Sequence, residues 1–342
     1  MWLSVNALPV RIRKAAGTSI RPLQLGVIGS GIDHPDLQAL QETGRVVCKA
    51  VHDPIASNIS AGEASGIRQC SRIEELLNSD LDGVIVASPR VLHISHCIAA
   101  LQSGKAVFVQ KPLARSAAET AAVLDVARSV DRLIAVDFPY RHIVGANELR
   151  RLIKDGQLGQ VFTADLIFHG VFGHERPWFY ECASGGGGCV MDVGVHLVDL
   201  ALGLLGDCVT GISSNLYRQG AKLHPPYEMV EDYATAEFFL GETQVRLACS
   251  WNLQATQDAV IEARFYGTEG GVALRNIKGS LQDFELHQFS ATTSRQVDRT
   301  PDAPLGGELG RWAARLGESN RFDPEVAQAL VVAQVIDRIY SR

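Results

Sequence analysis

The sequence predicts an α/β protein with two domains: an N-terminal domain with a doubly wound parallel sheet, and a C-terminal domain with a mostly antiparallel sheet. Over residues 22–139, short and nearly continuous apolar runs alternate with amphipathic stretches, as in a parallel sheet that helices cover on both faces. From about residue 157 the apolar runs follow one another across turn sequences, which is typical of antiparallel strands. A chain of 342 residues is long enough for both domains.

The first half is expected to alternate strands and helices. The strands are apolar on both faces and lie at 23–29, 46–53, 82–88, 106–110 and 133–138. The helices have apolar residues at helical spacing and lie at 35–44, 72–80, 91–104 and 116–130. Residues 1–21 contain basic but no acidic residues and are expected to form an N-terminal extension.

Residues 140–342 are expected to form the second domain. Its strands are predicted at 161–170, 209–217, 233–240, 243–253, 259–267, 271–276 and 280–290. A helix at about 188–205 interrupts the strands, and two more helices are predicted at 307–317 and 324–340. The last begins after Asp323 and Pro324, residue types that start helices, and can pack back on the first domain.

The composition excludes several classes of protein. Apolar residues make up 46% and charged residues 20% of the chain, as in a globular protein. The net charge of −6 gives no general attraction to nucleic acid. Because the sequence contains no run of 18 uninterrupted apolar residues, we expect no membrane partner. The seven cysteines form no CxxC pair, and the first apolar cluster precedes the first basic one, unlike a secretory signal. We therefore expect a cytoplasmic protein with free thiols.

A glycine-containing turn follows the first predicted strand. Gly29 and Gly31, with Ser30 and Ile32, stand where backbone N–H groups before a helix can bind a pyrophosphate. His34 occupies the position of the third glycine in the usual GxGxxG pattern. Alone, this turn is as consistent with an ordinary tight turn as with a cofactor loop.

Asp53 strengthens the cofactor interpretation. It ends the second predicted strand, where an acid can accept hydrogen bonds from the ribose of an adenosine, although before Pro54 it could also be a turn residue. The next basic residue is Arg68, so no cation stands close by to meet a 2′-phosphate. The sequence therefore favours NAD over NADP.

Ser88, Pro89 and Lys111 follow the next predicted strands, at the sheet edge where ligands bind in open α/β folds. A lysine there could contact a substrate hydroxyl or stabilise an alkoxide. It could also be an ordinary surface lysine, which is the commoner fate of a single lysine.

Asp192 and His196 follow a run of four glycines, Gly185 to Gly188, that can let the backbone approach a ligand closely. In an α-helix this i, i+4 pair leaves the same face and can touch. The helix start would keep His196 neutral, and the carboxylate could orient an imidazole that accepts a proton. Alternatively, Asp192 is an ordinary charge near a helix start and His196 a half-buried residue.

These segments together resemble the Gfo/Idh/MocA family of oxidoreductases: GVIGSGIDH, VHDP, VASPRVLHISHCIAALQSGKAVFVQKPLA and GGGGCVMDVGVHLVDLALGLLG, with GTEGG at 267–271 as the family's late turn. The resemblance runs from about residue 22 to the C-terminus. It implies an N-terminal Rossmann domain and a C-terminal α+β domain with a large, mostly antiparallel open sheet. It also implies nicotinamide-dependent oxidation or reduction of a sugar, cyclitol or sugar nucleotide, in a homodimer or homotetramer formed through the open sheet. Lys111 matches the lysine of the family's EKP motif, and Asp192 and His196 match its DxGxH.

The resemblance also implies further site residues and shows three departures. Cofactor contacts are expected from Ser88, Pro89, His93, Gln110 and Lys111, and candidate substrate contacts are Tyr140, Arg141, His169 and Trp178. Tyr140 and Trp178 are candidates because sugar rings pack their C–H faces on aromatic side chains, with a core role as the alternative, and His169 is open in the same way. Gln110 replaces the EKP glutamate, His34 replaces a small residue, and Pro139 with Tyr140 replaces a polar Asn and its neighbour.

The expected mechanism has His196 take the hydroxyl proton, Asp192 orient the imidazole and Lys111 hold the reacting oxygen. Three alternatives remain open. One is an NAD-dependent glycosidase of the same family, and another, suggested by Gln110 and His34, is a catalytically silent NAD-binding or sensor protein. The third is a zinc hydrolase using Asp192, His196 and His174, although no HExxH motif or cysteine pair supports a metal site.

Overall fold

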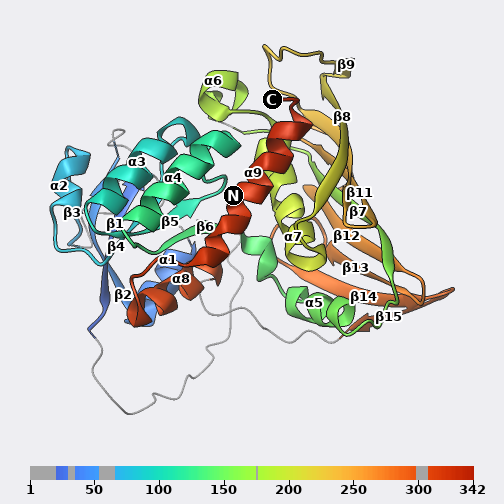
Figure 1. Cartoon of the computed structure of the whole chain (residues 1–342), viewed down its shortest axis with the longest axis horizontal. Helices are drawn as coiled ribbons and strands as arrows, with labels where there is room; N and C mark the ends of the chain where they lie inside the picture. The colour runs from blue at the N-terminus through green and yellow to red at the C-terminus, as the bar shows by residue number, and fades with distance from the viewer. Residues whose placement is uncertain (1–20, 30–34, 54–65, 175, 298–306) are drawn as a thin grey trace.

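The computed structural model describes residues 21–29, 35–53, 66–174, 176–297 and 307–342. It confirms the predicted fold class: a parallel sheet covered by helices lies beside a long antiparallel sheet (Figure 1). The predicted extension at 1–21 lies almost wholly outside the described residues.

The first sheet has the strand order of a dinucleotide-binding fold. In the described residues, six parallel strands are arranged β3-β2-β1-β4-β5-β6. The strands are β1 (Leu23–Gly29), β2 (Val46–His52), β3 (Arg68–Gln69), β4 (Gly83–Ala87), β5 (Ala106–Gln110) and β6 (Ile134–Asp137). The helices that connect and cover them are α1 (Pro35–Glu42), α2 (Ile73–Leu77), α3 (Arg90–Gln102) and α4 (Ala117–Ser129). All five strands predicted in this half are present.

A helix from the far end of the chain completes the first domain. Helix α8 (Gly307–Glu318) packs its buried Trp312 on Phe108 of β5, with ring centroids 5.7 Å apart. A Cβ on Gly83 of β4 would lie 2.7 Å from the same indole ring, so this position has no room for a side chain. The first domain therefore includes residues that the sequence analysis assigned to the second.

The second sheet is large and mostly antiparallel. Within the part of the chain that the structure describes, it has nine strands in the order β15-β14-β13-β12-β7-β11-β10-β8-β9, and every neighbouring pair is antiparallel except β7 and β11. The strands are β7 (Val161–Gly170), β8 (Val209–Arg218), β9 (Ala221–Lys222), β10 (Tyr233–Leu240), β11 (Thr243–Ser250), β12 (Ala259–Gly267), β13 (Gly271–Asn276), β14 (Phe284–Ser290) and β15 (Thr293–Val297).

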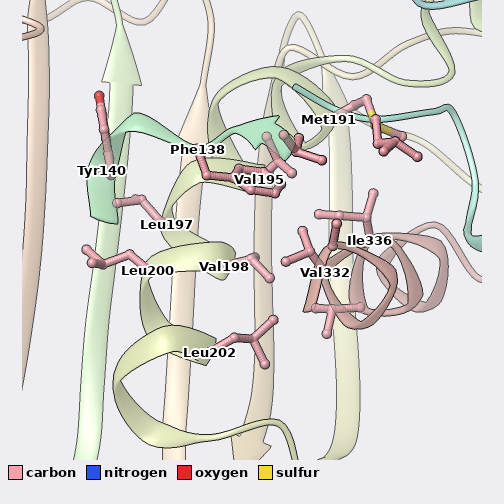
Figure 2. Packing of buried hydrophobic residues seen from close by; sticks show 14 of the residues in the cluster. Phe138, Tyr140, Met191, Val195, Leu197, Val198, Leu200, Leu202, Val332 and Ile336 are labelled. Carbon is pink, nitrogen blue, oxygen red and sulfur yellow. The ribbon is translucent and has the colours of Figure 1, made fainter. Parts of the chain in front are cut away.

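The central helix of the second domain covers one face of this sheet. It consists of a π turn, η6 (Val190–Gly194), followed by α7 (Val195–Leu205). Figure 2 shows Val198 and Leu202 of α7 pointing toward Val332 of the final helix, α9 (Gln328–Ile339). A Cβ on Gly194 would lie 3.1 Å from Cys249 Sγ of β11, so glycine allows the helix to pack closely on the strand.

The helical stretch Cys182–Leu205 is, among the described residues, long and apolar enough to cross a membrane, but most of it is buried in this fold. Its apolar character is therefore explained by packing between the sheet and α9. Several short elements were not predicted: the strands β3, β9 and β15, the helices α5 (Ala146–Lys154) and α6 (Cys182–Gly185), and the 3₁₀ turns η4 (Pro139–Arg141) and η5 (Pro177–Tyr180). The first turn of the helix predicted at 324–340 is the 3₁₀ turn η7 (Pro324–Ala327).

Helix α9 joins the two domains, and Figure 1 shows it between α4 and α7. Asp337 accepts a hydrogen bond from the backbone N–H of Ala117 at the start of α4 (2.8 Å). The buried hydroxyl of Tyr340, just after α9, donates to Glu231 (2.7 Å) and accepts from the backbone N–H of Met191 (3.3 Å).

We expect Tyr340→Phe to lower the free energy of unfolding by about 1–3 kcal/mol, because it leaves a buried N–H and a buried carboxylate each with one partner fewer. Urea denaturation measures this, with Tyr217→Phe as a control at a half-buried tyrosine of β8. Equal stability of the Tyr340→Phe variant and the parent would show that the hydroxyl contributes nothing.

Candidate active site

The predicted cofactor residues gather at the carboxyl edge of the parallel sheet. Gly29 ends β1, Asp53 follows β2, Ser88 and Pro89 follow β4, and Gln110 ends β5. Gly29 has φ of +93°, and a Cβ there would lie 2.5 Å from the carbonyl oxygen of Ala87. Both the positive φ and the close approach of Ala87 therefore require glycine at this position. The predicted residues Ser30, Gly31, Ile32 and His34 lie outside the described residues.

His93 has a structural role in place of the expected contact with a cofactor, because its ring lies between two backbone carbonyl oxygens. Its imidazole is 2% exposed, with Nε2 2.8 Å from the carbonyl oxygen of Ser88 and Nδ1 2.9 Å from that of Pro112. Burial lowers the pKa of His93 to about 4, so the neutral ring donates to one of these oxygens at a time. It thereby links the ends of β4 and β5, while the Oγ of Ser88 lies 2.9 Å from Nδ1 of His96.

Asp192 is the centre of the site. Among the described residues, four side chains donate hydrogen bonds to its carboxylate. Oδ1 accepts from Arg90 (3.0 Å) and Lys111 (2.9 Å), and Oδ2 accepts from His174 (2.6 Å) and the indole N–H of Trp251 (3.1 Å). Lys111 also donates to the backbone carbonyl of Asp192 (2.7 Å).

These partners keep the buried carboxyl group ionised. Burial alone would raise the pKa of Asp192, but Lys111, the hydrogen bond from His174, and Arg90 outweigh it and hold the pKa well below its usual range. Burial also lowers the pKa of Lys111, against the opposing effect of Asp192.

His196 lies near this cluster without the predicted contact to Asp192. Its Nδ1 is buried and has no hydrogen-bond partner among the described residues, and its ring stacks on Tyr140 with centroids 4.9 Å apart. The predicted orientation of His196 by Asp192 is therefore wrong for this structure. The reason is the π turn at Asp192, which joins residues five apart, so the α-helical i, i+4 relation does not apply.

The prediction of a neutral His196 is confirmed, but for a different reason. Burial comes first and the Lys111 ammonium second in holding the pKa of His196 well below its ordinary value. The expected cause was the start of the helix.

The glycine run serves protein packing, contrary to the expected approach of a ligand. A Cβ on Gly187 would lie 2.2 Å from the hydroxyl of Tyr340, and one on Gly188 would lie 1.9 Å from the carbonyl oxygen of Glu231. The Glu231 carboxylate also accepts hydrogen bonds from the N–H groups of Gly188 (3.0 Å) and Val190 (2.9 Å). A buried side chain of the protein thus occupies the start of this helix.

The four predicted substrate residues separate into two groups. Tyr140 stacks on His196, and Trp178 lies near the Asp192 cluster, its ring stacked on Phe179 with centroids 3.9 Å apart. Arg141 instead forms a paired hydrogen-bonded contact with the buried Asp199 and lines a separate cavity bounded by β6, α5 and α8.

His169 faces away from the site. It lies 2.9 Å from Ser250 Oγ and stacks on Tyr233 on the open face of the sheet, whereas the adjacent Phe168 stacks on Tyr140. Successive strand residues point to opposite faces, so only one of this pair can face the site. His169 and Arg141 are therefore corrections to the predicted set.

Sequence reasoning missed Arg90 and Trp251. Arg90 is 3% exposed, donates to Asp192 and to the carbonyl oxygen of Gly185 (3.1 Å), and lies 4.7 Å from the ring of Phe179. Its position directly after Ser88 and Pro89, at the ligand-binding sheet edge, was a signal that could have identified it. Trp251 follows β11, and nothing in its local sequence indicates its contact with Asp192.

The described residues contain no group of three or more His, Cys, Asp or Glu side chains arranged to hold a metal ion. Asp192, His174 and His196, the three residues of the zinc-hydrolase alternative, therefore form no such group in the described part of the chain.

Two family models together match most of the chain. One, described as an oxidoreductase family with an NAD-binding Rossmann fold, matches residues 23–138. The other, described as the GFO/IDH/MocA C-terminal domain, matches residues 146–273.

Three curated relatives are 27–29% identical to this chain where they align. A D-glucoside 3-dehydrogenase of Escherichia coli is 29% identical over 210 residues, covering 56% of this chain and 58% of the relative. A putative UDP-kanosamine synthase oxidoreductase subunit of Amycolatopsis mediterranei is 29% identical over 323 residues, covering 86% and 88%. A 1,5-anhydro-D-fructose reductase of Ensifer adhaerens matches over 52% of its length. The chain thus spans little more than half the length of two of these relatives.

Solved structures share the fold. A 3-ketoreductase from Actinomadura kijaniata, in complex with NADP and TDP-benzene, has a TM-score of 0.79 at 19% identity, covering 92% of this chain and 96% of that chain. A levoglucosan dehydrogenase in complex with NADH and L-sorbose has a TM-score of 0.77 at 20% identity, covering 93% and 96%.

We expect His93→Gln to reduce the pH dependence of stability. The pKa of His93 in the folded protein, about 4, lies below the ordinary 6.5, so the unfolded chain binds the proton first as the pH falls. The stability that this group contributes is complete above about pH 6.5 and is lost toward pH 4.

Between pH 7 and 5, the parent should therefore lose about 2 kcal/mol more than the variant. Urea denaturation at the two pH values measures the difference, with His224→Gln as a control at an exposed histidine. The same loss in parent and His93→Gln would contradict the assignment.

Proposed function

Because the chain belongs to the Gfo/Idh/MocA family of oxidoreductases, we propose that it transfers a hydride between a nicotinamide cofactor and a hydroxyl or keto group of a sugar, cyclitol or sugar nucleotide. The observation that carries the proposal is the ionised Asp192 holding Lys111 at 2.9 Å, close to a neutral imidazole, beside the carboxyl edge of the parallel sheet. Relatives named as dehydrogenases and reductases of sugars support it.

The residues at the sheet edge fit an adenine dinucleotide. Gly29 leaves the end of β1 without a side chain. Asp53 stands at the end of the adjacent strand, where a carboxylate can accept hydrogen bonds from the ribose hydroxyls of the adenosine. When bound, the nicotinamide supplies the hydride acceptor or donor. We propose NAD rather than NADP, because Asp53 disfavours a 2′-phosphate and the next basic residue along the chain is Arg68.

Each side chain of the site has a separate task in this proposal. Lys111 donates a hydrogen bond to the reacting oxygen and stabilises the negative charge that develops there. His196, neutral because it is buried, accepts the hydroxyl proton during oxidation and returns it during reduction. Asp192 holds Lys111 in place by accepting its hydrogen bond.

We further propose that the chain forms a homodimer or homotetramer through the open face of the nine-stranded sheet and works in the cytoplasm. That face lies on the side of the sheet opposite α7, and the apolar residues Ile167, Ala248 and Val260 are half-buried on it. All seven cysteines lie in described residues and are free, which supports a reducing compartment. Sedimentation equilibrium measures the subunit number.

The purified chain should reduce NAD when supplied with a suitable sugar or polyol from a broad panel, with a lower KM for NAD than for NADP. Net accumulation of NADH distinguishes a dehydrogenase from an NAD-dependent glycosidase, which regenerates its cofactor in each cycle. Tight NAD binding without turnover or bond cleavage on any compound would instead indicate a sensor protein and would overturn the proposal.

His196→Ala should lower kcat by about 10²- to 10⁴-fold, because the proton acceptor is lost, while NAD affinity changes little. Steady-state kinetics and NAD titration by fluorescence measure the two effects. His287→Ala, at a partly exposed position in β14, is the control. Unchanged turnover in His196→Ala would remove this residue from the mechanism.

A further inference from the structure

The two oxygens of Asp192 hold two different groups at the accessible side of the site. Oδ1 accepts from Lys111 and Oδ2 from His174. The side chains of Lys111 and His174 are 22% and 34% exposed, whereas those of Arg90 and Asp192 are 3% and 6% exposed. A molecule that enters the site therefore meets Lys111 and His174 rather than the carboxylate between them.

The contact with Asp192 fixes which nitrogen of His174 carries the proton. An ionised carboxylate only accepts hydrogen bonds, so the Nε2 of His174, 2.6 Å from Oδ2, must be the donor. In the neutral imidazole, the lone pair then lies on Nδ1. Lys111 is thus a donor, and the neutral His174 can accept a hydrogen bond at Nδ1.

Packing holds the ring of His174 in place. It stacks on Phe179 with centroids 3.5 Å apart and planes at 6°, and meets Trp251 edge-on at 5.3 Å. The imidazole is therefore oriented by two rings and a carboxylate before any substrate arrives. An acceptor that is ordered in advance loses little conformational freedom when a ligand binds.

We infer that His174 determines specificity by accepting a hydrogen bond, at Nδ1, from the hydroxyl adjacent to the one that reacts. Lys111 and His174 are both held by the carboxylate of Asp192. In the inferred complex, one hydroxyl of the substrate accepts a hydrogen bond from Lys111 and the neighbouring hydroxyl donates one to His174. The substrate is accordingly a vicinal diol. This inference rests on the proposed function, because it takes Lys111 to hold the reacting oxygen.

A double-mutant cycle on the full chain tests the inference. The two substrates are a sugar or polyol that the parent oxidises and its deoxy analogue, which lacks the hydroxyl next to the oxidised carbon. The parent should lose about tenfold to a hundredfold in kcat/KM on the deoxy compound, which is the value of one or two hydrogen bonds. His174→Phe also removes one donor from Asp192, so its kcat/KM should fall on both compounds, but the variant should act on the complete and the deoxy substrate with nearly equal kcat/KM.

Two further variants keep the test decisive. His174→Asn, whose side-chain amide can present an acceptor near the place of Nδ1, should recover part of the discrimination even if the bulkier Phe disturbs the loop. His224→Phe, at an exposed histidine, should discriminate as the parent does.

The outcomes separate this inference from the proposed function. Suppose that the parent oxidises the sugar, but the loss of the hydroxyl lowers kcat/KM by the same factor in His174→Phe as in the parent. His174 then does not contact that hydroxyl, and the inference is wrong. If the parent turns over no compound with NAD or NADP, the proposed function itself fails.

Discussion

The carboxylate of Asp192 is the interaction on which the site depends. An ionised carboxyl group buried without partners costs several kcal/mol or more, so the protein must supply donors for it. It does so from both domains: Arg90 and Lys111 belong to the first domain, and His174 and Trp251 belong to the second. The same contacts that satisfy this charge therefore hold the two domains in one arrangement around the reacting groups.

A second buried carboxylate supports the first. Glu231 accepts from the backbone N–H groups of Gly188 and Val190 and from the hydroxyl of Tyr340. These contacts fix the start of the helix that carries Asp192, and Tyr340 brings the C-terminal end of the chain to the same place. The close glycines are needed here because side chains would collide with Glu231 and Tyr340. The geometry of the site is thus set by packing several residues away from the chemistry.

Much of the fold could be predicted from the sequence, because buried strands such as 23–29 and 106–110 are apolar on both faces and need no tertiary information. The failures have physical causes. The short helix Ala146–Lys154 is strongly polar and was not identified. The π turn depends on tertiary contacts, so spacing alone placed Asp192 against His196. His169 and Arg141 were misplaced because a sequence motif does not show which face of a sheet, or which side of a turn, a residue occupies.

The return of helix α8 to the first domain has a consequence for how the protein is made. Trp312 covers Phe108 and fills the space above Gly83, yet all the described strands of the antiparallel sheet lie between them in the sequence. During synthesis the parallel sheet emerges first, and the part of one face that Trp312 covers stays open until α8 leaves the ribosome. Contacts so distant in sequence slow folding and leave apolar surface exposed meanwhile. The nascent first domain therefore exposes apolar surface, and is open to aggregation, until α8 has been made.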